Sequence, residues 1–193
     1  MRLALALLAS LLCLPIADAA AAKRKPCPQT GVVENRFAVL SWKETAREPD
    51  HHVLQACVKA GRKRVTVGDW TSSGSSWDGP APVYALTERY AAFHLQTCAD
   101  PTDTATCTSL LRLTNLRSGA RRTVRLDAPL SADLVLTRRG SAALGFADGR
   151  LLAIGAAVET LDTAAEPGSV AYAPTARRLY WTAAGQPRSA VLR

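Results

Sequence analysis

The feature that most constrains the fold of this chain is a strand–turn–strand pattern that occurs four times along the sequence. Its centre is a short apolar segment, seen as AVLSW (38–42), AAFHL (91–95), AALGF (142–146) and RLYWT (178–182). The segments stand 53, 51 and 36 residues apart when their equivalent positions are taken as Val39, Ala92, Ala143 and Leu179. Repeats of this length predict stacked β-sheet units such as propeller blades.

Each central segment has strand-like neighbours on both sides. A short apolar run precedes each of the four: GVVEN (31–35), PVYALTE (82–88), DLVLTR (133–138) and SVAYAP (169–174). The first two segments are followed by hairpins with basic, glycine-containing tips, and the last ends the chain as a single hairpin. We therefore expect an all-β fold of consecutive antiparallel meander units, propeller-like and incomplete, with about three and a half units. A two-sheet β-sandwich is the alternative.

No part of the chain after residue 22 holds a 3.6-residue apolar period over three turns. This predicts at least ten strands and no helix longer than two turns. The polar stretches predict breaks between units near 68–82, 127–132 and 163–168. The expected core contains the apolar residues of the repeated segments: Val39, Leu40, Trp42, Phe93, Leu95, Leu144, Phe146, Leu179 and Trp181.

The order of several segments carries a family resemblance. VVENRFAVLSW is followed by a strand with a cysteine, then by AGRKRVTV, SGARRTVRL and a closing LYWTAAGQPRSAVL. In this order the chain resembles uncharacterised exported bacterial proteins whose repeats are similar to those of TolB-type β-propellers. The resemblance implies a propeller-like fold over nearly the whole chain after residue 22. It implies no catalytic residue, because the shared segments are strands and turns.

The first 22 residues have the pattern of a secretory signal peptide. Arg2 precedes an apolar run from Leu3 to Ile16, and Ala17–Ala22 contains small-residue cleavage sites. We expect residues 1–22 to be removed and residues 23–193 to form one all-β repeat domain, secreted or associated with the cell envelope. No transmembrane segment is expected after cleavage.

Removal of the signal peptide leaves four of the five cysteines. An even number in an exported chain predicts two disulfides. Cys98 ends one predicted strand and Cys107 begins the next, so the two face each other across the mouth of a hairpin. Cys27 and Cys57 then pair by elimination. A zinc site is not expected, since these cysteines include no C-x-x-C pair.

The charge of the chain favours anionic partners. Its net charge is +8, and its basic residues gather in small clusters, such as Arg62–Arg64 and Arg121–Arg122. The clusters lie mostly at predicted turns, where solvated arginine is ordinary, and aromatic side chains do not alternate with them as nucleic-acid binding would require. An envelope polysaccharide, another anionic polymer or a protein is the expected partner, and nucleic acid is not.

Catalytic and cofactor motifs are missing from the sequence. GSSWDG (74–79) is not a nucleophile elbow, and no phosphate-binding or dinucleotide-binding loop is present. Asp100 and Asp103 share a loop but lack the spacing of a calcium loop. A lone strand histidine such as His94 is more often a packed residue than a general base. We expect no catalytic residue, metal ligand or cofactor.

Two tryptophans are the candidates for contact with a ligand. Trp70 and Trp77 flank a serine- and glycine-rich loop, where aromatic rings of a rigid β scaffold can stack on sugars or peptides. Alternatively, both cap the core beneath the loop. The sequence thus favours a binding protein. Two other functions stay open: a secreted hydrolase with a site built from loops, and a self-assembling structural protein that forms a homodimer.

Overall fold

The computed structural model describes residues 25–45, 48–71, 83–98, 107–127 and 131–192. This part of the chain forms fifteen strands, and its only helical element is the three-residue 3-10 turn η1 (Ala60–Arg62). The expectation of at least ten strands and no long helix is confirmed for these residues. The predicted signal peptide, residues 1–22, lies outside them.

The strands form four antiparallel meanders in chain order. The first sheet consists of β1 (Val33–Glu34), β2 (Ala38–Thr45), β3 (Glu48–Val58) and β4 (Lys63–Thr71). The second consists of β5 (Val83–Leu86), β6 (Tyr90–Cys98), β7 (Cys107–Asn115) and β8 (Arg121–Leu126). The third consists of β9 (Asp133–Leu136), β10 (Ala142–Gly145), β11 (Leu151–Ile154) and β12 (Val158–Asp162). The fourth is shorter and consists of β13 (Ala171–Ala173), β14 (Arg178–Ala183) and β15 (Gln186–Val191).

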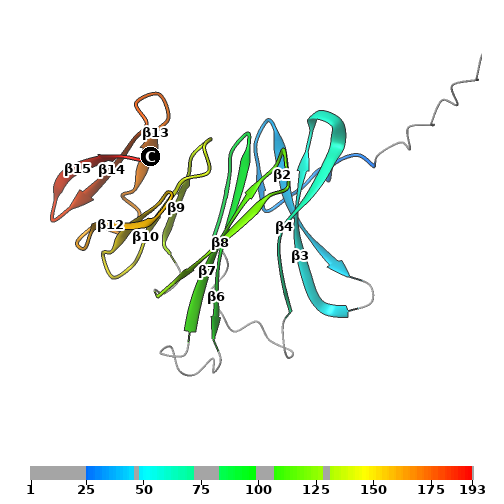
Figure 1. Ribbon diagram of the computed structural model, residues 1–193, viewed down its shortest axis with the longest axis horizontal. Coiled ribbons are helices and arrows are strands. Elements are labelled where there is room, and N and C mark those ends of the chain that lie inside the picture. The colour runs from blue at the N-terminus through cyan, green and yellow to red at the C-terminus, as the bar shows by residue number, and fades with distance from the viewer. Residues whose placement is uncertain (1–24, 46–47, 72–82, 99–106, 128–130, 193) are drawn as a thin grey trace, which may run out of the picture.

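The four sheets stand side by side in chain order, from the blue and cyan first sheet to the orange and red fourth sheet (Figure 1). The stack is open, with the first and fourth sheets at its two ends. The first strands of neighbouring sheets meet along one side, where β5 lies beside both β1 and β9. The predicted propeller-like, incomplete arrangement of meander units is therefore correct. The breaks also agree, except that β4 continues to Thr71, so the first break begins later than residue 68.

Three apolar cores lie between the sheets, one at each interface. Phe93 packs with Leu40 and Leu54 between the first two sheets. Leu111 packs with Leu144 between the second and third sheets. The last interface contains Leu151, Leu179 and Trp181. Because every meander has apolar residues on a face that it cannot bury alone, the stacking holds the units together.

All predicted core residues are buried except Trp42. Trp42 is half-buried, and its ring packs edge-on against Tyr84 and Phe93 at centroid distances of 5.8 and 5.9 Å. A side chain of this size is often largely but not fully covered.

One detail of the predicted repeat alignment is wrong. Val39 pairs with Glu34 near the end of β1, and the matching positions in the next two sheets are Ala91 and Ala142. The sequence alignment used Ala92 and Ala143, one residue later. The middle sheets are buried on both faces, so their central strands lack the alternation that would reveal a shift of one residue.

Candidate functional site

The turns that follow the first strand of the first three sheets are built alike. Asn35, Thr87 and Thr137 take equivalent places, directly after β1, β5 and β9. The side-chain oxygen of Asn35 accepts hydrogen bonds from the backbone N–H groups of Phe37 and Ala38, at 2.8 and 2.9 Å. The hydroxyls of Thr87 and Thr137 accept equivalent backbone bonds of 3.0–3.4 Å. Such local caps favour a defined turn conformation, so these turns present the residues after them in a fixed way.

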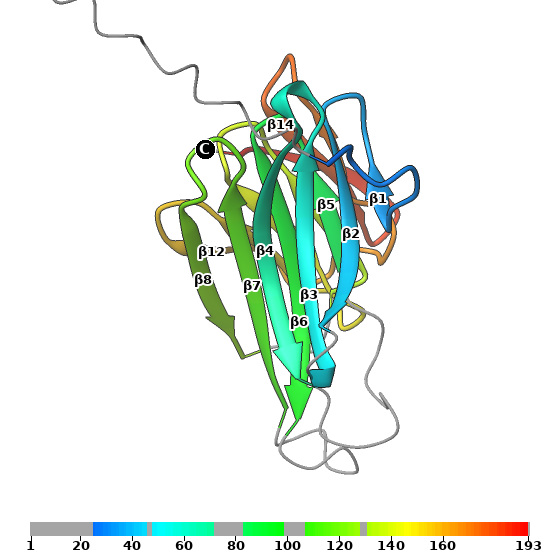
Figure 2. The same cartoon turned by 90° about the vertical axis from the view of Figure 1, so that its right-hand side faces the viewer.

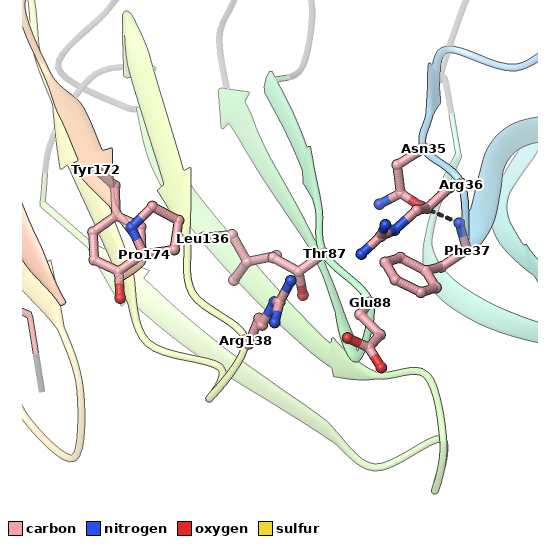
Figure 3. A pocket seen from close by; sticks show the side chains of 9 residues that line it. All are labelled: Asn35, Arg36, Phe37, Thr87, Glu88, Leu136, Arg138, Tyr172 and Pro174. Carbon is pink, nitrogen blue, oxygen red and sulfur yellow. Dashed lines mark hydrogen bonds between the residues drawn. The ribbon is translucent and has the colours of Figure 1, made fainter. Parts of the chain in front are cut away.

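These turns and the turn after β13 in the fourth sheet border one hollow of about 270 Å³, here called the axial groove. Its lining comes from all four sheets: Asn35, Arg36, Phe37, Thr87, Glu88, Leu136, Arg138, Tyr172 and Pro174. In Figure 3, Thr87, Glu88 and Arg138 lie near the middle of the groove. Tyr172 and Pro174 lie on one side of them, and Arg36 and Phe37 on the other.

The axial groove combines an apolar floor with exposed charges. Leu136 is buried, and Phe37 and Tyr172 are half-buried. The guanidinium of Arg36 lies 4.6 Å from the centre of the Phe37 ring, a cation–π distance. Within the described residues, neither Arg36 nor Arg138 forms an ion pair. Both cations are thus available to an anion that enters the groove.

The groove belongs to a larger basic surface, which we call the turn end. In an antiparallel meander the first and third turns lie at the same end of the sheet, here the upper end in Figure 1. The turn end comprises the turns at 35–37, 59–62, 87–89, 116–120, 137–141, 155–157 and 174–177. Glu88 is their one acidic residue, and the basic ones are Arg36, Lys59, Arg62, Arg89, Arg117, Arg138, Arg139 and Arg177.

The opposite end, here called the loop end, has a different charge. Its described connections hold the carboxylates of Asp127, Asp148 and Glu166, together with Arg150. Arg150 forms an ion pair with Asp148 at 2.7 Å. Among the described connections between strands, the turn end therefore holds most of the basic residues.

One of the two predicted disulfides is present. Cys27 and Cys57 are joined, with their Cα atoms 5.5 Å apart. Cys98 and Cys107 stand opposite each other in the register of β6 and β7, as expected for a hairpin mouth. Their side chains lie outside the described residues, so the second disulfide stays a prediction.

The predicted ligand-binding tryptophans cannot be placed at the groove. Trp77 lies outside the described residues, as do Asp100 and Asp103. The backbone of Trp70 lies in β4 opposite His52, but its side chain is also outside the description. Among the described residues, no group of three or more His, Cys, Asp or Glu side chains could hold a metal ion.

His94 is a packed residue, buried between the second and third sheets. Its Nδ1 accepts hydrogen bonds from the Ser131 hydroxyl at 2.7 Å and from the Ser131 backbone N–H at 3.2 Å. This places the ring proton on Nε2, which has no partner within the described chain and lies at an interface shared with Phe146. Burial lowers the pKa of His94 to about 4, so the ring is neutral at physiological pH.

Sequence reasoning did not find the axial groove. Arg36, Glu88 and Arg138 each occupy the second position of an equivalent turn, so an alignment made on the turns would have brought them together.

Neither a known protein family nor a curated protein matches this sequence. No helix in the described part of the chain is long and apolar enough to span a membrane.

Proposed function

We propose that this protein binds an anionic polymer of the cell envelope through its turn end. The observation that carries the proposal is that six of the seven turns of that end carry basic residues, around a groove to which all four sheets contribute. The proposed place of action is extracytoplasmic. It is supported by the signal-like N-terminus and by the Cys27–Cys57 disulfide, a bond that persists in oxidising compartments.

A polymer suits this surface better than a small anion does. The cations are spread across several turns, and a chain of repeated negative charges can meet many of them at once. The half-buried rings of Phe37 and Tyr172 add apolar surface on which a sugar ring can pack.

Binding is also favoured over hydrolysis by the position of His94. A general base must reach the substrate, and His94 is fully buried with Ser131 as its polar partner. Exposed Arg36 and Arg138 supply charge to attract an anion, but a guanidinium stays protonated and cannot act as a base.

The test is affinity for heparin, used as a sulfated polysaccharide probe, at low and high salt. The double variant Arg36→Gln/Arg138→Gln should bind roughly tenfold more weakly at low salt, because it loses two exposed cations of the groove. The control is Lys43→Gln/Arg125→Gln, which removes two exposed cations from strands outside the turn end. The proposal is wrong if both double variants bind alike, or if the protein does not bind heparin even at low salt.

A further inference from the structure

A second cavity lies beside the turn between β3 and β4. It has a volume of about 460 Å³, and the described residues that line it are all basic: Lys25, Arg62, Lys63 and Arg64. We call it the basic hollow. No carboxylate is among the described residues of its lining, and neighbouring like charges repel one another. Such a cluster is stabilised when a multiply charged anion enters it.

The N-terminal segment brings Lys25 to this cluster. Cys27 is bonded to Cys57 of β3, and the Pro26 carbonyl accepts a hydrogen bond from Arg64 Nη2 at 2.9 Å. Further along, the backbone N–H of Val32 donates to the Leu40 carbonyl at 2.8 Å. The segment therefore lies against the outer face of the first sheet, and the disulfide fixes its start next to the turn.

The contact at Gly31 leaves little freedom to this segment. A Cβ atom there would clash with the Leu40 carbonyl oxygen and with Val39 Cγ1, so no residue with a side chain fits without a shift of the backbone. Beneath the segment, Val39 and Cys57 are each only 1% exposed. Two restraints thus hold the segment that follows Lys25 in place, the disulfide at Cys27 and the close packing at Gly31.

The turn itself carries a strained arginine. Arg62 has a φ of 52°, in the left-handed region that side chains other than glycine, asparagine and aspartate seldom adopt. Strained backbone of this kind gathers at binding sites, where the fold holds a side chain in a required place. Arg62 is among the residues that line the hollow.

We propose that the basic hollow binds a phosphate group of the anionic polymer, and that the Cys27–Cys57 disulfide maintains this site. The arginine fork matches the geometry of phosphate oxygens, and Lys25 adds a point charge, while Lys63 Nζ donates to the Arg117 carbonyl at the edge of the hollow. A cluster of cations favours an anion with more than the single charge of a carboxylate, so a phosphate monoester substituent, with about two charges, fits better than a phosphodiester link. The identity of the carrier polymer rests on the proposed function, whereas phosphate binding at the hollow does not.

The test is calorimetric titration of the purified protein with inorganic pyrophosphate. Lys25→Gln should weaken binding roughly tenfold, because it removes one charge-assisted contact. Cys27→Ser/Cys57→Ser should weaken it to a similar extent, with folding checked by thermal unfolding. The matched control is Arg121→Gln. Arg121 is the first residue of β8, as Lys63 is the first residue of β4, but the N-terminal segment does not lie beside it. It should bind pyrophosphate as the unchanged protein does.

The outcomes separate this inference from the proposed function. If pyrophosphate fails to bind, or binds Lys25→Gln as tightly as the unchanged protein, the site is refuted even if heparin binding at the turn end persists. If pyrophosphate binding depends on Lys25 while heparin does not bind, the site stands and the proposed function fails. The protein could instead bind phosphatidylglycerol vesicles through Lys25 and fail to bind a phosphate-substituted polysaccharide. This result would show that the phosphate belongs to a lipid, and the proposal of a polymer would be wrong.

Discussion

His94 is fully buried where the second and third sheets pack together. Its two hydrogen bonds from Ser131 require an unprotonated Nδ1, and the surrounding core disfavours a charge. The sequence supports the interpretation that a lone strand histidine is a packed residue. The partner Ser131 stands 37 positions along the chain, in the connection before β9, and only the stacking of the sheets brings the two together.

We predict that acid destabilises the protein through His94. Its pKa is about 4 when folded and near 6.5 when unfolded, so the unfolded chain takes up a proton first as the pH falls. The contribution of His94 to stability should fall between pH 6.5 and 4, by up to about 3 kcal/mol, and change no further below that range. Chemical unfolding at several pH values measures this. In His94→Leu the slope between pH 7 and 5 should flatten, and an unchanged slope would contradict the assignment.

Trp181 joins the last two sheets through a polar contact as well as through packing. Its indole N–H donates to Asp162 Oδ2 at 2.6 Å, and Arg188 reaches the same oxygen at 3.0 Å. The Trp181 hydrogen bond, together with the backbone N–H groups of Thr163 and Ala164, lowers the pKa of Asp162. The sequence predicted the burial of Trp181 from its place in the repeat, but not this partner at the end of β12.

Trp181→Phe should therefore cost about 1–3 kcal/mol of unfolding free energy, since it leaves a buried carboxylate with one fewer donor. The pKa of Asp162, followed by NMR, should rise at the same time. Tyr180→Phe is the matched control, because Tyr180 is 43% exposed and its loss of a hydroxyl should change stability by less than about 0.5 kcal/mol. Equal stability of the two variants would show that the indole hydrogen bond contributes nothing.

At the level of elements, the β6–β7 hairpin carries the prediction that the structure leaves open. Cys98 and Cys107 occupy facing positions at its mouth, and facing residues of antiparallel strands lie about 4.5–5.5 Å apart at Cα, within the reach of a disulfide. A peptide map of the unreduced protein should show this crosslink beside Cys27–Cys57. A crosslink between Cys57 and Cys98 would contradict both the pairing and the strand order.

The strands could be predicted from the sequence where they belong to the repeated pattern of apolar segments. The short first strands, the central strands and the breaks between sheets follow the apolar runs and polar connections of the sequence. The register in the second and third sheets was not predictable, because Ala91 and Ala92 are both buried, one against each neighbouring sheet. The axial groove was missed for another reason: it forms only when four turns from distant parts of the chain meet.

At the scale of the whole molecule, the two ends of the stacked sheets differ in charge. The turn end is basic apart from Glu88, and the loop end carries Asp127, Asp148 and Glu166. Figure 2 shows how the geometry produces this, with β2, β3 and β4 of the first sheet in front of β6 and β7 of the second, so that equivalent turns meet at one end. A repeat therefore adds its turn charges to one shared surface.

The binding of a polyanion to the turn end is tested most directly by an NMR titration of the isotope-labelled protein with heparin fragments at low salt. The account predicts shifts of the backbone amides in the turns at 35–37, 87–89 and 137–141. It also predicts shifts of the side-chain Nε–H groups of Arg36 and Arg138, and their reversal at high salt, where exposed charges are screened. The amides at 146–150 and 163–168, at the loop end, should stay in place. Shifts confined to the loop end, or none at the turn end, would contradict the account.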